Sequence, residues 1–591
     1  MVDTLSQVFL NTVKTYVKPD LLAAKIEGRY VPIPTEEFAR RVRHLSLGLA
    51  DLGLAPGEKL IILSENRPEW TITDFAVLCA GAITVPIYTS LMPEQVKYII
   101  NDSDARIVVC SNRDLWLKIE AVRGGLKSVH HFVLIDEEGP RGVVSLSEIM
   151  ARGKTLEAAD PELFERRALA VKPDDVASII YTSGTTGVPK GVMLTHANFV
   201  SNSKALDAVT EFSVKDTILS FLPLSHVLER MTTFSFLYKG ASIYYAESIE
   251  TVAENLLEVR PTIMISVPRL FDKIYAKVMD NVLAQPALKR KIFFWALGVG
   301  KKYGARKIRH ESIPAWLALR RRLAAKLVYG KIIEKTGGRV HFFVSGGAPL
   351  SGDVAEFFYA IGITILEGYG LTETSPVLTC NTFDRMKFGT VGPAVPGVRI
   401  EIAPDGEILA QGPNVMKGYY KKPRETAEAF EAGSFKTGDI GHFDEEGFLV
   451  ITDRKKDILV TAGGKNVAPQ PIENLLKTNP YIQSAVVVGG GRKFISALIV
   501  PEFDRLEAYA RSRGLSFAGR KELVEREEIR SFMLAEVNRA TPDLASYERI
   551  KKIVLLEREF DAETELTPSL KVKRHIVEKA FKPAIDLLYK D

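Results

Sequence analysis

The stretch Tyr181-Thr-Ser-Gly-Thr-Thr-Gly-Val-Pro-Lys-Gly191 directly follows a short apolar run at residues 176–180. Residues 182–190 contain four hydroxyl side chains, two glycines and one lysine. Glycines let a backbone curl closely around an anion, while hydroxyls, main-chain N–H groups and an ammonium group donate hydrogen bonds to it. A flexible surface loop rarely carries so many donors just after a buried strand. The stretch therefore predicts a loop that binds a triphosphate.

This loop is not of the Walker type, which requires the pattern G-x-x-x-x-G-K-[ST]. Here Gly184 and Gly187 are three residues apart, and Lys190 follows after three more. The stretch instead resembles the phosphate loop of the adenylate-forming superfamily, which includes acyl-CoA synthetases, luciferases, coumarate ligases and the adenylation domains of peptide synthetases. The resemblance implies that ATP is bound by Thr182, Ser183, Gly184, Thr185, Thr186, Gly187 and Lys190, with Thr185 also beside a metal ion.

Length and composition indicate an ordinary globular protein. The 591 residues suffice for roughly two to four domains, and 46% hydrophobic with 26% charged residues allow a sizeable core. The three isolated cysteines give neither a disulfide framework nor a metal-binding spacing, which favours a reducing cytosol. The first residues lack the basic start and apolar core of a signal peptide, so we expect a cytoplasmic protein. The longest uncharged run, residues 75–93, contains Gly81 and Pro86 and predicts a buried helix and strand rather than a membrane span.

Positive charge is concentrated at residues 289–331, where 13 Lys and Arg face one acid, Glu311. The same segment holds Trp295 and Trp316, two of the four tryptophans. Basic residues mixed with aromatic ones at helical spacing indicate an amphipathic element that contacts an anionic membrane, here the inner face. The alternative is a solvated helical hairpin whose aromatic residues enter the core. No nucleic-acid-binding motif accompanies the patch, so we do not expect a nucleic-acid partner.

The first 450 residues or so alternate helical patterns with short β-rich runs. Residues 35–54 have the pattern of an amphipathic helix, and residues 59–63, 106–110 and 131–135 have that of buried strands. This alternation predicts an α/β fold with layered, largely parallel sheets.

Three apolar runs lead directly into unusual loops. They are residues 176–180 before the phosphate loop, residues 341–344 before 345–350, and residues 363–366 before 367–374. In open α/β sheets, ligands bind outside the carboxyl ends of the strands. We therefore expect the three loops to form a single site.

The predicted pattern of secondary structure changes twice in the last third of the sequence. From about residue 395, short strands with Asp-Gly and Glu-Gly turns predict a β-rich subdomain. After the charged stretch at 453–457, strands near 484–488, 495–500 and 550–555 predict a small α+β domain. We expect a large N-terminal domain at 1–453, with the subdomain at about 395–453, and a mobile C-terminal domain at 454–591.

The stretch Gly368-Tyr-Gly-Leu-Thr-Glu373 resembles the adenine and magnesium motif of the superfamily. A hard cation such as Mg²⁺ prefers one or two carboxylates together with phosphate oxygens and waters, and Glu373 beside Thr372 can supply the carboxylate. Taken alone, Glu373 would more often be a surface acid. The resemblance implies that the adenine and its surroundings are bound by Tyr369, which stacks on the ring, and by Gly347, Ala348, Pro349, Glu367, Gly368, Gly370 and Thr372.

The stretch Lys436-Thr-Gly-Asp439 resembles the ribose clamp of the family, in which Asp439 accepts hydrogen bonds from the ribose hydroxyls. Arg454 matches a second nucleotide-contacting position, where a guanidinium fork suits ribose or phosphate oxygens. The alternative for each residue is a surface ion pair. Lys456 matches the hinge about which the C-terminal domain of the family rotates between its two reactions.

The resemblance gives two further roles in the C-terminal domain. Lys571 matches the adenylation lysine, which would stabilise the transition state as a carboxylate attacks the α-phosphate. Many relatives have glycine before this lysine where the chain has Leu570, and Lys573 is the competing choice. The loop with Gly463, Gly464 and Lys465 matches the segment along the pantetheine arm of coenzyme A, with one residue inserted relative to luciferase-like members.

Residues 222–230 and 267–275 resemble signatures of long-chain fatty acyl-CoA synthetases. His226 stands where the family flanks the acyl carboxylate, although a lone histidine is usually a satisfied polar residue. The tryptophan that gates the acyl tunnel in some relatives is absent, and Arg230 is near its place.

The resemblance therefore implies an ATP-dependent long-chain fatty acid–CoA ligase that uses Mg²⁺, ATP and coenzyme A and forms an acyl-adenylate. One alternative is a medium-chain or aryl acid as substrate, or an acyl carrier protein as acceptor. Another is a catalytically silent lipid-binding or scaffold protein, whose signature would be loss of Glu373, Arg454 or Lys571; the chain retains all three. The oligomeric state stays undecided, with a homodimer as one option.

Overall fold

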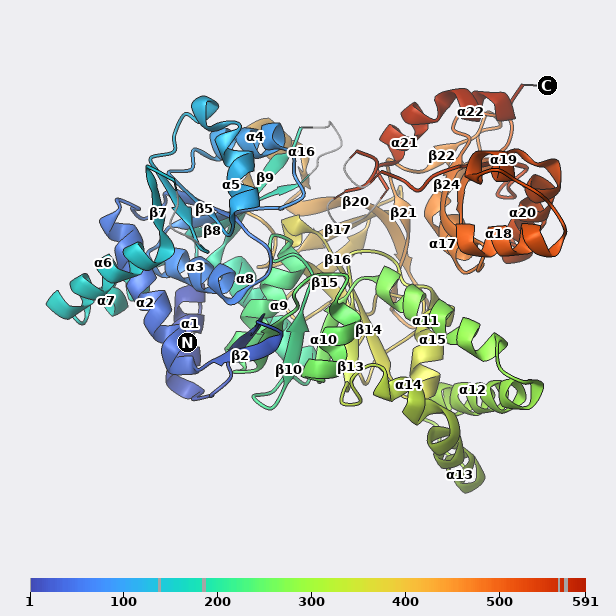
Figure 1. Ribbon diagram of the computed structural model, residues 1–591, viewed down its shortest axis with the longest axis horizontal. Coiled ribbons are helices and arrows are strands. Elements are labelled where there is room, and N and C mark those ends of the chain that lie inside the picture. Colours follow the sequence, from blue (N-terminus) through green and yellow to red (C-terminus); the bar gives the residue numbers. More distant parts are fainter. Residues whose placement is uncertain (1, 137–139, 183–187, 562–563, 568–571, 591) are drawn as a thin grey trace. The chain divides into compact units, whose positions relative to one another are not determined.

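The computed structural model describes residues 2–136, 140–182, 188–561, 564–567 and 572–590 (Figure 1). The chain divides into two compact units. Unit 1 comprises Met1–Leu270, Asn281–Glu401 and Leu409–Lys436, and unit 2 comprises Phe271–Asp280, Ile402–Ile408 and Thr437–Asp591.

The first eight-stranded sheet lies in unit 1. In spatial order it contains β18 (Gly418–Tyr419), β9 (Lys190–Thr195), β8 (Val176–Thr182), β4 (Ile83–Ile87), β3 (Lys59–Leu63), β5 (Ile107–Cys110), β6 (His131–Leu134) and β7 (Val143–Ser145). The strands from β8 to β7 are parallel neighbours, whereas β9 returns antiparallel to β8. Strand β4 is buried at every position, as is typical of a parallel strand covered on both faces.

The second eight-stranded sheet of unit 1 contains, in spatial order, β15 (Val377–Cys380), β14 (Thr364–Gly370), β13 (Phe342–Ser345), β12 (Ile263–Ser266), β10 (Thr217–Ser220), β11 (Ser242–Tyr245), β1 (Leu22–Ile26) and β2 (Arg29–Ile33). Its interior pairs are parallel, and only its two edges are antiparallel. The predicted α/β class with layered, largely parallel sheets is confirmed.

Helices of unit 1 cover these sheets. They are α1 (Leu5–Thr15), α2 (Thr35–Asp51), α3 (Pro68–Cys79), α4 (Pro93–Ser103), α5 (Arg113–Glu120), α6 (Leu146–Ala159), α7 (Leu163–Ala170), α8 (His196–Val209), α9 (Val227–Tyr238), α10 (Val252–Val259), α15 (Gly352–Ile361) and α16 (Pro423–Glu428). Helix α9 is buried from Val227 to Leu237, consistent with its largely apolar composition. The ring of Phe234 on α9 packs edge-on against Phe75 and Phe199, each with centroids 5.4 Å apart.

Glycine allows α2 and α6 to cross at close range. A Cβ atom on Gly153 of α6 would lie 1.7 Å from the carbonyl oxygen of His44, and one on Gly48 of α2 would lie 1.9 Å from that of Ile149. Any larger residue at these positions would force the two helices apart.

The basic segment forms a group of helices that Figure 1 shows in green at the lower right. They are α12 (Ala287–Ile308), α13 (Ala315–Ala324), a π-helical turn (Ala325–Tyr329) and α14 (Gly330–Glu334), and α11 (Pro268–Leu283) precedes them. No helix in the described ranges is long and apolar enough to cross a membrane.

Residues 399–454 form the β-rich part of the chain. Strands β16 (Arg399–Ile402), β17 (Glu407–Gln411), β20 (Ser434–Phe443) and β19 (Phe430–Glu431) follow one another in the sheet, and β21 (Leu449–Arg454) pairs with β20. The pairing of β20 with β21 is antiparallel and places Asp439 opposite Arg454.

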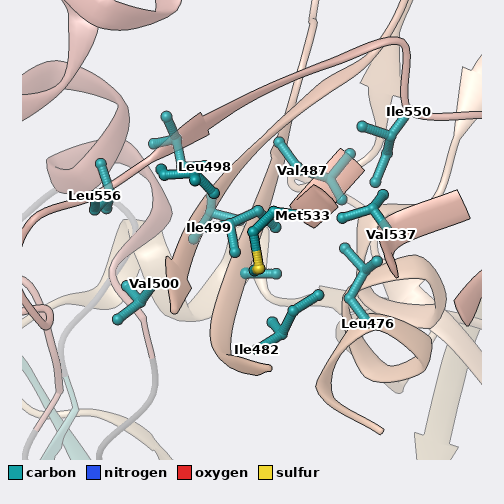
Figure 2. Close-up of a cluster of buried hydrophobic side chains, with 14 of the residues drawn as sticks. Leu476, Ile482, Val487, Leu498, Ile499, Val500, Met533, Val537, Ile550 and Leu556 are labelled. Atoms are coloured by element: carbon teal, nitrogen blue, oxygen red, sulfur yellow. The ribbon is translucent and has the colours of Figure 1, made fainter. Parts of the chain in front are cut away.

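The C-terminal part of unit 2 has a sheet of β24 (Ile482–Val488), β25 (Ser496–Pro501) and β26 (Lys552–Leu555). Around it lie α17 (Pro469–Lys477), α18 (Phe503–Ser512), α19 (Arg520–Glu525), α20 (Glu527–Ala540), α21 (Arg574–Ala580) and α22 (Lys582–Leu588). Figure 2 shows the core, in which Met533 of α20 lies beside Ile499 of β25 and Leu476 of α17 lies beside Val537 of α20. Apolar burial of this kind is the main term that stabilises a small domain.

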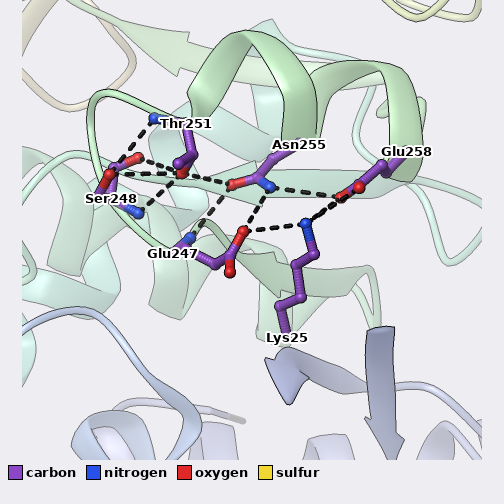
Figure 3. Close-up of polar contacts among 6 residues, drawn as sticks. All are labelled: Lys25, Glu247, Ser248, Thr251, Asn255 and Glu258. Atoms are coloured by element: carbon purple, nitrogen blue, oxygen red, sulfur yellow. Dashed lines mark hydrogen bonds and ion pairs between the residues drawn. The ribbon is translucent and has the colours of Figure 1, made fainter. Parts of the chain in front are cut away.

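A cluster of charged residues on unit 1 serves the fold. Lys25 on β1 forms ion pairs with Glu247 at 3.0 Å and Glu258 at 2.9 Å, while Asn255 bonds to both acids (Figure 3). These contacts join the N-terminal strand to α10 and the segment before it. Because its members satisfy one another, we interpret the cluster as structural.

Candidate active site

Strands β8 and β9 present the two ends of the predicted phosphate loop. Thr182, the last residue of β8, pairs with Lys190, the first residue of β9. Ser183, Gly184, Thr185, Thr186 and Gly187 lie outside the described residues. The flanking strands thus hold Thr182 and Lys190 side by side at the carboxyl end of β8.

Glu373 lies close to the end of β8 and the start of β9. It is the middle residue of a short 3₁₀ helix (Thr372–Thr374) that follows β14. The hydroxyl of Tyr419 donates a hydrogen bond of 2.9 Å to its Oε1, and the Lys190 ammonium lies 5.1 Å from the centroid of the Tyr419 ring. The structure therefore brings together Lys190 and Glu373, which are far apart in the sequence.

Tyr419 was not among the predicted site residues. Its strand β18 has only two residues and pairs with β9, where Tyr419 lies opposite Val192. Burial, followed by the charge of Glu373, raises the pKa of the Tyr419 hydroxyl, so it stays a hydrogen-bond donor. The only signal in the sequence is the aromatic pair at 419–420, which is too common to suggest a function.

The two predicted adenine loops leave the second sheet side by side. Ser345 at the end of β13 pairs with Glu367 on β14, so residues 346–349 and 368–370 start from neighbouring positions. Strand β14 continues to Gly370, four residues beyond the end of the predicted run at residue 366, because β15 folds back and pairs with it antiparallel. Tyr369 and Gly370 are therefore strand residues and not part of an irregular loop.

Burial distinguishes the residues around these loops. Glu367 is buried, and this raises the pKa of its carboxyl to about 8, although the backbone amides of Gly389 and Leu350 donate to it. The buried Ser345 hydroxyl has no hydrogen-bond partner among the described residues. Ala348 and Pro349, in contrast, are exposed.

Gly347 has a positive φ of +81°, which disfavours any other residue. The preceding residue, Gly346, donates its amide to the Ser266 carbonyl at 3.1 Å. A Cβ atom on Gly346 would lie 3.1 Å from the Leu228 side chain. The loop after β13 therefore touches the first turn of α9.

His226 is the N-cap of α9. Its Nδ1 accepts a hydrogen bond of 3.2 Å from the Leu228 amide. A neutral ring whose Nδ1 accepts must carry its proton on Nε2. The capping contact thus sets the tautomer of a neutral His226 ring.

Arg230, by contrast, does not lie at a surface. Its side chain is 0% exposed and forms a two-pronged ion pair with Asp74 of α3 at 2.5 and 2.8 Å. A second buried basic residue, His196, accepts from the Leu5 amide, and burial lowers the pKa of its imidazole to about 3. Both residues belong to the core.

In unit 2, the predicted ribose residues are also neighbours. Arg454 Nε lies 3.2 Å from Asp439 Oδ1, and the Asp439 side chain is buried whereas that of Arg454 is half-exposed. Lys455 forms ion pairs with Asp405 at 2.6 Å and Glu407 at 2.7 Å. The carboxylate and the guanidinium fork thus form one polar pair on adjacent strands.

The predicted hinge and coenzyme A residues lie just after this pair. Burial and the charge of Arg454 lower the pKa of Lys456. Gly463, Gly464 and Lys465 form the turn between β22 (Leu459–Val460) and β23 (Asn466–Val467), and Gly464 has a φ of +72°.

Of the two candidate adenylation lysines, Lys571 lies outside the described residues. The competing Lys573 donates from its Nζ to the Thr564 carbonyl at 3.2 Å, and burial lowers its pKa. No group of three or more His, Cys, Asp or Glu side chains able to hold a metal ion occurs among the residues that the structure describes. A metal at Glu373 would therefore need further oxygen atoms from a ligand or from water.

Comparison with known proteins identifies the family. The model of the AMP-binding enzyme family matches residues 17–420, and that of the AMP-binding enzyme C-terminal domain matches residues 456–591. The long-chain-fatty-acid–CoA ligase FadD15 of Mycobacterium bovis is 37% identical over 571 residues, which are 95% of this chain and 93% of that protein. The peroxisomal long chain acyl-CoA synthetase 7 of Arabidopsis thaliana is 31% identical over an alignment of 627 positions, which covers 100% of this chain and 86% of that protein.

A solved structure shows the same fold. The adenylation domain of a carboxylate reductase from Mycobacterium chelonae matches with a TM-score of 0.76 at 22% identity, over 100% of this chain and 91% of that chain. The family match covers about two thirds of the sequence and includes the segment that carries Thr182, Lys190, Glu373 and Tyr419. The chain therefore belongs to the AMP-binding enzyme family.

Proposed function

We propose that the protein is an ATP-dependent ligase that joins a long-chain fatty acid to coenzyme A through an acyl-adenylate. The names of its relatives in Mycobacterium bovis and Arabidopsis thaliana support this substrate class. The single structural observation that carries the proposal is the cluster of Lys190, Tyr419 and Glu373 at the end of β8 and the start of β9. A cation and a carboxylate next to a glycine-rich loop suit a polyphosphate with its counter-ion.

The resemblance to the family assigns the nucleotide to the following residues. In unit 1, Thr182, the loop after it and Lys190 would hold the β- and γ-phosphates. Tyr369 and residues 347–349 would enclose the adenine, and the unpartnered Ser345 hydroxyl is available to a polar group of the ligand. The ribose clamp that the resemblance implies, Asp439 with Arg454, would bind the ribose hydroxyls.

The residues present fit Mg²⁺ in its usual protein setting. Glu373 supplies one carboxylate, Thr185 would lie beside the ion, and phosphate oxygens and water would complete the shell, since Mg²⁺ rarely uses an all-protein cage. When bound, the ion would neutralise charge on the phosphate oxygens. The Tyr419 hydroxyl, which donates to Oε1 of Glu373, would keep that carboxylate in one orientation.

The proposed chemistry has two steps. A carboxylate oxygen of the fatty acid bonds to the α-phosphorus, and the bond to the β-phosphate oxygen breaks, so pyrophosphate leaves with the electron pair. His226 would hold the carboxylate through Nε2–H, and Lys571 would stabilise the charge that develops. Rotation of the C-terminal domain at Lys456 would bring the loop with Gly463, Gly464 and Lys465 to coenzyme A, whose sulfur attacks the acyl carbon and displaces AMP.

Acid-dependent exchange between pyrophosphate and ATP tests the first step. We expect exchange with palmitate to exceed exchange with octanoate and coumarate, and thioester to appear only when coenzyme A is added. If exchange is fastest with coumarate or octanoate, the substrate is not a long-chain acid. If a thioester forms only on an acyl carrier protein, the acceptor is that protein and not coenzyme A. Absence of exchange with every acid would contradict the proposed function.

We further infer that the basic helices at residues 289–331 contact an anionic membrane. Phe294, Trp316 and Leu319 are 45%, 54% and 68% exposed, and the guanidinium of Arg320 lies 5.2 Å from the Trp316 ring. Exposed aromatic and aliphatic side chains beside cations suit the boundary between head groups and acyl chains. Other aromatic residues of the segment, such as Phe293, are buried.

The three consecutive arginines of α13 do not share one role. Arg321 of α13 donates to the Ala360 carbonyl of α15 and lies 4.5 Å from the Tyr329 ring, so it fixes α13 to α15. Arg320 and Arg322 are exposed. A test of membrane binding should therefore change these two and leave Arg321 intact.

We expect the double variant Arg320→Gln/Arg322→Gln to bind phosphatidylglycerol vesicles about 10- to 30-fold more weakly, since each cation near an anionic surface contributes about 1 kcal/mol. The matched control is Arg511→Gln/Arg513→Gln, which removes two exposed arginines from unit 2. Equal binding by wild type and both variants would mean that the segment is a solvated hairpin.

A further inference from the structure

Two adjacent residues at the start of α9, Glu229 and Arg230, are both buried, with exposed fractions of 3% and 0%. Charged residues are almost never buried unless they are paired. The proposed reaction gives neither residue a role. Their positions, one turn after His226, suggest that they act on that residue.

Arg230 connects α9 to the sheet that carries the phosphate loop. Its guanidinium donates two hydrogen bonds to Asp74 of α3, and its third nitrogen donates to the Ser178 hydroxyl on β8. Ser178 in turn donates to the Thr84 carbonyl on β4 at 2.7 Å. Strand β8 ends at Thr182, where the phosphate loop begins.

Glu229 connects the same turn to the other sheet. Its Oε1 accepts a hydrogen bond of 2.5 Å from the Ser220 hydroxyl at the end of β10. The side-chain amide of Asn66 donates to the Ser220 hydroxyl at 3.2 Å and to the Leu222 carbonyl at 2.6 Å. Glu229 thereby ties α9 to the segment that leads from β10 into the helix.

The two connections end on different sheets, since β8 belongs to the first eight-stranded sheet and β10 to the second. The Arg230 amide donates to the His226 carbonyl at 3.2 Å, which is the first helical hydrogen bond of this turn. Whatever fixes Glu229 and Arg230 therefore also fixes the backbone of His226.

We propose that Glu229 and Arg230 form a two-sided anchor that positions His226 relative to the phosphate loop at the end of β8. Both are positioning residues, and the inference rests on the proposed function of His226 as the contact of the fatty carboxylate. Attack on the α-phosphorus requires the reacting atoms to approach within about 3–3.5 Å, and a misplacement of about 1 Å can slow such a step on the order of 100-fold. The anchor holds His226 at a fixed distance from the phosphate loop, because within one helical turn it joins α9 to both β8 and β10.

Stability alone does not require this arrangement. A buried ion pair is often no more stabilising than apolar residues of the same volume. The surroundings of Arg230 would accept an apolar replacement, since the rings of Trp70, Phe199 and Phe234 lie 5.6–5.7 Å from its guanidinium. A positional role explains why the ion pair of Arg230 and Asp74 lies there.

The variant Ser178→Ala tests the anchor, because it removes the contact of Arg230 with β8 and keeps the ion pair with Asp74. The matched control is Ser235→Ala on α9, the helix that carries Arg230. It also removes a buried hydroxyl, which is bonded to Ser203 at 3.0 Å. We expect Ser178→Ala to lower kcat for palmitate-dependent exchange by about 10- to 100-fold, with the KM for ATP changed less than about 3-fold. Thiolysis of supplied palmitoyl-adenylate should stay within about 3-fold of wild type in both variants.

Equal loss of exchange and thiolysis in Ser178→Ala would overturn the proposal, as would exchange equal to that of Ser235→Ala. If Ser178→Ala fails to fold, Asp74→Leu/Arg230→Met serves in its place, because it removes the pair without leaving a lone buried charge. This variant should show the same selective loss of kcat, and wild-type exchange would overturn the proposal.

One readout separates failure of the anchor from failure of the proposed function. The ring signals of His226, observed by NMR with labelled histidine, should shift in Ser178→Ala and stay in place in Ser235→Ala. If the wild-type protein shows no palmitate-dependent exchange, the proposed function fails, while the His226 signals still decide whether the anchor positions this ring. Unchanged His226 signals in Ser178→Ala would overturn the anchor.

Discussion

Replacing Glu229 by glutamine should remove a pH-dependent loss of stability from unit 1. Burial raises the pKa of the Glu229 carboxyl from 4.5 to about 8, although the hydrogen bond from Ser220 acts in the opposite direction. Between these two values the folded protein binds more protons than the unfolded chain. The free energy of unfolding therefore falls as the pH rises through this window, and it levels off above about pH 8.

The size of the effect follows from the same two values. Each pKa unit corresponds to about 1.4 kcal/mol, so the full loss amounts to roughly 5 kcal/mol, of which about 3 kcal/mol is already present at pH 7. Glutamine has nearly the same shape, still accepts from Ser220 and does not ionise. The stability of Glu229→Gln relative to wild type should therefore increase by roughly 3 kcal/mol between pH 5.5 and pH 8.5.

Urea unfolding followed by tryptophan fluorescence measures this difference, because all four tryptophans (Trp70, Trp116, Trp295 and Trp316) lie in unit 1. Glu367, whose pKa is also raised to about 8, is present in both proteins and cancels in the comparison. Burial keeps the neighbouring Tyr245 neutral by raising its pKa. The exposed Glu254→Gln variant serves as the matched control for the loss of a carboxyl group. If Glu229→Gln keeps a constant offset from wild type from pH 5.5 to 8.5, the carboxyl is not held neutral by burial and the reasoning fails.

Three further predictions concern the site and the fold. Tyr419→Phe should raise the Mg²⁺ concentration needed for half-maximal exchange by about 5- to 10-fold, since one hydrogen bond to the Glu373 carboxylate is lost; an unchanged Mg²⁺ titration would contradict this role. Lys571→Ala should abolish acyl-adenylate formation and leave thiolysis of supplied acyl-adenylate largely intact, and equal loss of both steps would refute its assignment. Gly153→Ala should lower the urea midpoint, because its Cβ would lie 1.7 Å from a backbone oxygen. Gly298→Ala, which meets nothing within 4 Å, should raise that midpoint or leave it unchanged, and an equal drop in both variants would refute the steric argument.

Local patterns in the sequence predicted most of the strands that carry the site. The expected run at 59–63 is β3 (Lys59–Leu63), and that at 176–180 begins β8 (Val176–Thr182). Such strands are predictable because continuous apolar runs are what a doubly covered parallel strand requires. The continuation of β14 to Gly370 was not predictable, since it depends on pairing with β15 and not on its own composition.

The basic segment shows why a composition pattern can support two alternatives at once. Its aromatic residues were expected either at a membrane surface or in the core, and the structure buries some of them and exposes others. Phe293 and Leu317 are buried, while Phe294 and Trp316 are exposed. Helix α12 packs against α15, and Gly300 of α12 allows an approach so close that a Cβ would lie 2.3 Å from the Ala360 oxygen of α15.

The residues that sequence reasoning missed have partners that are distant in the chain. Tyr419 is 46 residues from Glu373, and Arg230 is 156 residues from Asp74. Their roles have no local signature, because only the paired sheets bring the partners together. The sequence placed Arg230 near the gating tryptophan of some relatives, and a charged residue is normally expected at a surface.

The structure argues against a gate at Arg230. A gating side chain must change its rotamer, and this guanidinium would have to leave Asp74, Ser178 and three aromatic rings while 0% exposed to water. Breaking a buried pair in this way typically costs about 3–5 kcal/mol, because the carboxylate of Asp74 would be left without its partner. A side chain under that constraint suits a fixed frame. Entry of the acyl chain must therefore be controlled at another position, and the charge at residue 230 belongs to the frame that holds His226.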